Sequence, residues 1–155
     1  MPKPKFSLIA EVEPLRALVE EIDHKVLAAW AIDCAERVLP YFEEAFPDDD
    51  RPRRALDTLQ AWIDTGVFKM AVIRKASLDA HAAAREVGED NPARSAARAA
   101  GQAVATAHGR GHGPGAAIYA RQAVHRASSA EEAAAAVAAE RAWQVARLVA
   151  LRDDE

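Results

Sequence analysis

Three histidines, His81, His108 and His112, have the side chains and part of the spacing that a metal site would need. His108 and His112 are four residues apart, and on a continuous helix that spacing directs both rings to one face. Gly109, Gly111 and Gly113 argue against a regular helix here, and neither histidine has the neighbouring glutamate of an HExxH motif. The sequence therefore favours structural or solvent-facing histidines, and it predicts no metal ion or other cofactor.

Five charged residues form a candidate polar face for contact with a partner. Asp33 and Arg37 are four residues apart on one predicted helix, where they can pair with each other. If a second helix covers them, they become a buried pair that fixes packing or lines a site. Asp50, Arg51 and Arg53 combine acidic and basic groups at the start of the next helix, which suits oriented docking of a charged partner. The same five residues are equally consistent with a structural network.

A third group lies along one side of a predicted helix at 70–87, where Arg74, His81 and Arg85 are spaced to share a face. A histidine between two arginines stays neutral unless a carboxylate joins them. Asp33 or one of the aspartates at 48–50 could supply that carboxylate. The group could bind an anion or form a structural network, and the network is favoured because no residue completes an active site.

Two further features carry weaker signals. Cys34 is the only cysteine, which excludes an internal disulfide, and its place within an apolar helical stripe predicts a buried, inert thiol. The segment GRGHGPG, residues 109–115, lacks the GxxxxGK[ST] pattern of a phosphate-binding loop. It predicts a corner between helices, with the next helix starting near Ala116.

Composition indicates the fold that must position these residues. Hydrophobic residues make up 50% of the 155-residue chain although aromatic residues make up only 6%, and alanine fills the gap. Alanine is the best helix former and lets helix axes approach closely. No segment alternates with a period of two, so the sequence predicts an all-α bundle of about six to seven Ala-rich helices without a sheet. We expect a loose arm over residues 1–6 and a single domain over residues 7–152.

Capping signals and apolar periodicity predict where the helices begin and end. The residues that mark helix ends are Asp23, either Asp49 or Asp50, Gly66, Asn91 and the capping-box pair Ser129 and Glu132. Pro14 and Pro40 fall inside predicted helices and should kink or break them. The expected helices cover 7–21, 23–46, 51–65, 70–87, 92–108, 116–127 and a last one from 129 through 151.

Charge and hydropathy limit the possible partners. The net charge is -4 and the sequence pI is about 5.8, so the chain lacks the basic footprint of a protein that binds nucleic-acid phosphates. No apolar run is long enough for a membrane span, and the N-terminus lacks the apolar core of a signal peptide. These features and the single cysteine predict a cytoplasmic protein that binds neither nucleic acid nor membrane.

Several stretches of the chain are similar to one known family. WAIDCAERVLPYFEE at 30–44, followed by DDDRPRRAL at 48–56, resembles the Imm-5-like family of immunity proteins. The other similar stretches are SLDAHAAAR at 77–85, ARAAGQAVATAH at 97–108, AAIYARQAV at 116–124 and ERAWQVARL at 140–148. The resemblance spans about residues 27–152. It implies an all-α protein of bacterial polymorphic toxin systems that binds a cognate toxin and protects the producing cell, and it supplies no catalytic residues.

We therefore expect a non-enzymatic immunity protein that neutralises its cognate toxin by occlusion. One alternative is a helical-bundle metal- or anion-binding protein or enzyme that uses His81, His108 and His112. A second alternative is an oligomeric scaffold whose last helix, with Trp143 and Leu148, buries one face against a second copy. Convergence of the three histidine rings in space would distinguish the metal-binding alternative from the other two.

Overall fold

The computed structural model describes the backbone of residues 2–154 and the side chains of residues 2–8 and 15–154. These residues form seven helices and no strand, which confirms the prediction of an all-α bundle. The helices are α1 Leu8–Glu20, α2 His24–Ala45, α3 Arg51–Thr65, α4 Met70–Arg85, α5 Pro92–Ala105, α6 His112–Ala127 and α7 Ala133–Asp153.

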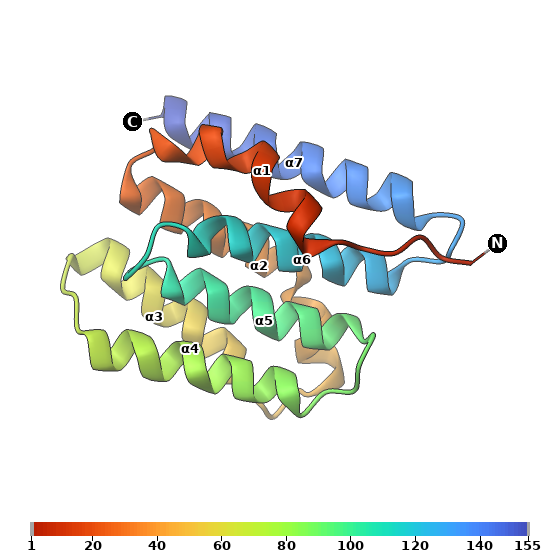
Figure 1. Ribbon diagram of the computed structural model, residues 1–155. Helices are drawn as coiled ribbons and strands as arrows, with labels where there is room; N and C mark the ends of the chain where they lie inside the picture. Colours follow the sequence, from red (N-terminus) through yellow and green to blue (C-terminus); the bar gives the residue numbers. More distant parts are fainter. Residues whose placement is uncertain (1, 155) are drawn as a thin grey trace.

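Helix α5 lies in the middle of the bundle and contacts α2, α3, α4 and α6. Figure 1 shows α3 and α4 at one edge of the molecule, with α1 and α7 at the opposite edge. The buried positions of α5 are mostly alanines: Ala93, Ala96, Ala97, Ala99, Ala100, Ala103 and Ala105. Because small side chains let neighbouring helix axes approach closely, α5 is buried along most of its circumference. Its partly exposed side is a narrow stripe that contains Arg94, Arg98 and Gln102.

The predicted caps hold several helix ends. The Asp23 side chain accepts a hydrogen bond from the Lys25 backbone N–H at 3.1 Å, and Asn91 accepts one from the Ala93 N–H at 2.8 Å. Gly66 ends α3 with a φ of 70°, in the left-handed region that favours glycine. Each of these caps acts through backbone groups within a few residues, so the sequence was sufficient to predict them.

The glycine-rich segment is only partly a corner between helices. Helix α6 begins at His112, so Gly113, Pro114 and the following glycine lie in its first turn. Proline suits a first turn because its missing N–H would have no partner within the helix. A Cβ on Gly113 would lie 3.0 Å from Leu27 Cγ, so glycine makes room for α2 at this point. The prediction that the helix restarts near Ala116 is therefore wrong, because this glycine serves close packing.

Two prolines lie inside helices without ending them. Helix α1 continues through position 14, and α2 continues through Pro40 to Ala45. An interior proline costs a helix about 3 kcal/mol, whereas full burial of one large apolar side chain contributes about 1.5–3 kcal/mol. Leu39 and Phe42 are both buried beside Pro40 and hold this part of α2 in the core. Tertiary packing therefore outweighs the local preference against proline.

A buried polar network joins α2, α6 and α7. The Trp30 indole N–H donates to the backbone carbonyl of Gln144 at 2.8 Å. The Gln144 side chain donates to the carbonyl of Ala117 at 2.9 Å and accepts from Arg121 Nε at 2.6 Å. The side chains of Trp30, Arg121 and Gln144 are all fully buried. Because a buried polar group is stable only when it is hydrogen-bonded, this network fixes how α7 packs against α2 and α6.

Replacing Gln144 by leucine should destabilise the fold by about 3 kcal/mol or more, because it removes the acceptor of Arg121 Nε at nearly constant volume. Urea unfolding followed by circular dichroism measures the loss. The control Ala146→Leu, on the exposed side of α7, should change stability by less than about 0.5 kcal/mol. Equal effects of the two substitutions would contradict a structural role for the network.

Candidate functional site

The first two members of the predicted polar face pair with α7 and not with each other. Asp33 Oδ2 accepts from Arg147 Nε at 2.8 Å. Arg37 donates to both carboxylate oxygens of Glu140 at 2.8 Å each, and its guanidinium lies 3.9 Å from the centre of the Trp143 ring. Helix α7 covers this side of α2 and supplies a separate partner for each residue, so both residues hold the two helices together.

The other three members of the polar face lie at the start of α3 and also have partners within the chain. The pairs are Arg51 with Asp49 and Glu86, Arg53 with Glu43 and Glu36, and Asp50 with Arg54. The hydrogen bond from Arg51 holds the pKa of Asp49 below its usual value. These pairs connect α3 to α2 and α4. In the free chain, Arg51 and Arg53 are therefore already paired with carboxylates.

Two of the three candidate metal ligands form hydrogen bonds, each with a different partner. The ring centres of His108 and His112 lie 4.9 Å apart, and His112 Nδ1 lies 2.8 Å from Gln102 Oε1. His81 Nδ1 instead lies 2.8 Å from the Arg98 guanidinium, which donates to it. Among the residues that the structure describes, no three His, Cys, Asp or Glu side chains are grouped as metal ligands.

The histidine between arginines is neutral, as its position in the sequence indicates. Burial lowers the pKa of His81 to about 4, and the positive charges of Arg98 and Arg85 contribute to the shift. Asp33, a predicted partner of this group, is bound to Arg147 instead. His81 therefore belongs to a cationic group on α4 and α5 and serves in it as a neutral acceptor.

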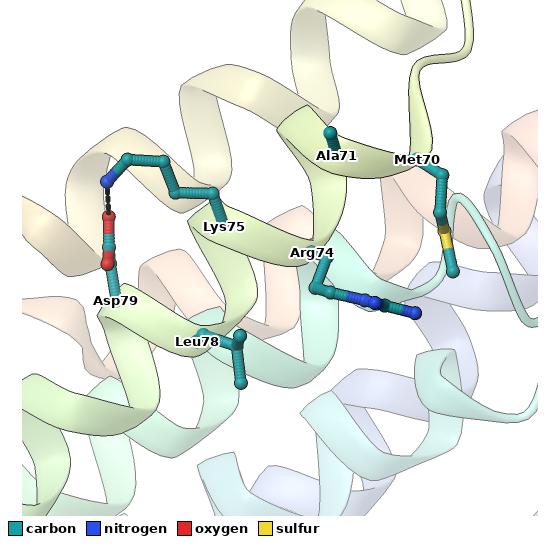
Figure 2. Close-up of a pocket in the computed structure, with 6 residues that line it drawn as sticks. All are labelled: Met70, Ala71, Arg74, Lys75, Leu78 and Asp79. Atoms are coloured by element: carbon teal, nitrogen blue, oxygen red, sulfur yellow. Dashed lines mark hydrogen bonds and ion pairs between the residues drawn. The ribbon is translucent and has the colours of Figure 1, made fainter.

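The outer side of α4 combines apolar and basic side chains. In Figure 2, Met70, Arg74 and Leu78 project from one side of the helix, while Lys75 and Asp79 lie on the other side, joined at 2.6 Å. These residues line a shallow surface hollow of about 410 Å³. Leu78 is 57% exposed and Met70 is 41% exposed, so neither contributes much to the core. Their positions make them available for contact with another molecule.

The basic side chains of this surface continue from α4 onto α5. We call the following residues the α4–α5 strip: Met70, Arg74, Leu78 and Arg85 of α4, with Arg94 and Arg98 of α5. Within the described part of the chain, none of these four arginines forms an ion pair with a carboxylate. Burial lowers the pKa of Arg98, and the nearby charges of Arg94 and Arg85 lower it further, although a guanidinium stays charged at neutral pH.

Charge segregation along the chain is the signal that could have identified the α5 part of this strip from the sequence. No Asp or Glu occurs between Asp90 and Glu131. The same stretch contains five arginines: Arg94, Arg98, Arg110, Arg121 and Arg126. The net charge of -4 for the whole chain hides this separation, because the acidic residues are concentrated elsewhere.

The two residues of α7 that the scaffold alternative assigned to a second copy contact the chain's own core. Leu148 is fully buried and packs in a cluster with Leu15 of α1 and Leu27 of α2. Trp143 packs against the same cluster and lies beside the Arg37 guanidinium. Both side chains are therefore used within the fold.

Comparison with known proteins places this all-α bundle in a family. A family model described as "Imm-5 like putative immunity protein" matches residues 17–151. Because the match covers most of the 155 residues, the chain belongs to this immunity-protein family. No curated protein and no solved structure matches the chain. Within the described residues, no helix has both the length and the apolar character needed to cross a membrane.

His81 should make stability depend on pH. Its pKa in the folded chain, about 4, lies below the ordinary 6.5, so the unfolded chain binds a proton first as the pH falls. The contribution of His81 to the free energy of unfolding is therefore complete above about pH 6.5, and it is lost as the pH falls from about 6.5 to about 4. Between about pH 7 and pH 4.5, the wild type should lose about 1–2 kcal/mol more than His81→Gln in urea unfolding, after allowance for the partly exposed ring. Equal losses would contradict a neutral, partly buried His81.

Proposed function

We propose that this protein neutralises a protein toxin by binding it and covering the surface through which the toxin acts. Membership of an immunity-protein family supports this role. The toxin would belong to a bacterial polymorphic toxin system, and the complex would form in the cytoplasm of the producing cell.

Exposed apolar side chains on the α3–α4 connection and along α4 are the observation that carries the proposal. Their exposed fractions are 60% for Val67, 46% for Phe68, 41% for Met70, 50% for Val72 and 57% for Leu78. Burial in an interface stabilises such groups by about 25 cal/mol per Å² of apolar surface. Val67 and Val72 line one surface hollow, and Met70 and Leu78 line another. Exposed apolar side chains that gather in this way mark sites of interaction with other proteins.

The side chains that could act as nucleophile or base support a role in binding rather than catalysis. Burial raises the pKa of the Cys34 thiol well above its usual value, and the carboxylates of Glu140 and Asp33 raise it further. A reactive cysteine needs the opposite environment, because the thiolate is the nucleophile. His81 Nδ1 is already in contact with Arg98. We therefore propose that the protein acts without catalysis.

The polar face predicted from the sequence is a second candidate contact surface. Arg51 and Arg53 remain partly exposed, with 30% and 38% of their side chains accessible. Exposed ion pairs contribute about 0–1 kcal/mol to stability, so carboxylates of a partner could replace the present partners of these arginines at little cost in free energy. The two surfaces can be tested separately, because Arg53 lies on α3 and Leu78 lies on α4.

Capture followed by co-expression tests the proposed function. The tagged protein is purified from its own host under native conditions, and each captured protein is then expressed alone and together with it. We expect one stoichiometric partner that stops growth when expressed alone and is harmless when co-expressed. A partner that is harmless by itself, or whose toxicity persists on co-expression, would contradict the proposal.

Leu78→Asp should weaken capture of that partner by about tenfold or more, because it replaces an exposed apolar contact by a charge. The fold should be unaffected, since Leu78 is 57% exposed. Ala138→Asp, at an exposed position on α7, is the matched control and should bind like the wild type. If Arg53→Ala weakens capture and Leu78→Asp does not, the contact surface is the polar face.

A further inference from the structure

We propose that the partner binds the α4–α5 strip through an acidic surface, with its carboxylates on the four arginines and an apolar side chain against Leu78 and Met70. The inference rests on the proposed function and adds to it the chemistry of the partner and the place where it docks.

The strip arginines differ from the arginines that hold the fold together. Four arginines that hold the fold together by ion pairs lie on α2, α3 and α7: Arg37, Arg51, Arg53 and Arg147, each with a carboxylate oxygen at 2.6–2.8 Å. In the part of the chain that the structure describes, no strip arginine has such a partner. Arg98 is bound to a neutral ring, and Arg94 donates to the Val87 carbonyl. Their charges are therefore available to an incoming anion.

The packing of α5 keeps these charges close to one another. Arg94 and Arg98 are one turn apart on the partly exposed stripe of α5. Arg85 approaches from α4, near enough that its charge lowers the pKa of Arg98. Carboxylates from a partner would relieve the repulsion among these guanidiniums and can accept two parallel hydrogen bonds from each of them. The strip is thus complementary to a cluster of Asp or Glu side chains.

The apolar residues of the strip fit a protein partner. Leu78 lies one turn from Arg74 and two turns from Arg85 along α4, so basic side chains stand on both sides of it. An apolar centre surrounded by charged groups is the usual anatomy of a protein–protein interface. Attraction between the basic strip and an acidic patch of similar size would also orient the partner as it docks.

A nucleic acid fits this surface less well than an acidic protein does. The net charge of the chain is -4, so phosphates beyond the strip would meet a repulsive surface. Carboxylates also border the strip, because Glu86 binds Arg51 and Asp90 lies 4.0 Å from Arg126. A short acidic patch on a folded protein matches the limited extent of the strip.

Peptide selection on the full-length protein tests the chemistry of the strip without knowledge of the toxin. A phage-displayed random peptide library is the main probe, and a single-stranded oligonucleotide of about 20 nucleotides is the second. The test variant is Arg74→Glu/Arg98→Glu. The control is Arg54→Glu/Arg152→Glu, which changes the net charge equally but alters residues outside the strip that pair with Asp50 and Asp153.

We expect enriched peptides that combine several Asp or Glu residues with a Leu, Ile or Phe. They should bind the test variant at least about tenfold more weakly than the wild type. Their affinity for the control should stay within about twofold of that for the wild type. Peptides without an acidic bias, or equal losses in both variants, would overturn the proposal. The proposal would be overturned in favour of nucleic acid if the oligonucleotide binds the wild type more tightly than the peptides do and if only the test variant loses this binding. If the test variant does not fold, Arg74→Gln/Arg98→Gln replaces it.

The co-expression assay separates failure of this inference from failure of the proposed function. If the wild type and Arg74→Glu/Arg98→Glu protect equally against the captured toxin, the strip is not the docking site although the function stands. If the wild type protects against no captured protein, the proposed function fails, and the peptide selection still decides which chemistry the strip binds.

Discussion

The close packing of α5 against its neighbours is the constraint on which the rest of the structure depends. Most of the buried residues of this helix are alanines. Gly101 lets α4 approach so closely that a Cβ at this position would lie 2.6 Å from His81 Nε2. The partly exposed stripe that remains includes Arg94 and Arg98. Figure 1 shows α5 beside α4. Packing of small residues thus decides which charges of α5 lie next to α4.

Two groups of arginines differ in their use, and this difference separates structure from proposed function. On α2, α3 and α7, Arg37, Arg53 and Arg147 pair with carboxylates and fasten helices to one another, as Arg37 does with Glu140. On α4 and α5, the arginines of the other group stand together beside an exposed leucine, Leu78, and within the described residues they lack carboxylate partners. An immunity protein needs a stable scaffold and a surface that its partner completes. The two sets of arginines match these two requirements.

The sequence predicted most of the fold and little of the candidate site, for physical reasons. Caps such as Asp23 and Gly66 act on nearby backbone groups, so local pattern was enough. Gly113 was misjudged because its role depends on a residue of another helix. The expected pair of Asp33 and Arg37 assumed an uncovered helix, whereas α7 supplies each with a different partner. Net charge was a poor guide because it sums over residues that folding places on different surfaces.

The central claim is that the α4–α5 strip keeps like charges together for a partner, although this lowers the stability of the chain alone. Urea unfolding of Arg98→Gln and wild type, at low and high salt, tests it most directly. We predict that the variant is more stable by about 0.5 kcal/mol at low salt and that the difference shrinks as salt screens the charges. A variant less stable than the wild type would show that Arg98 serves the fold and would contradict the claim.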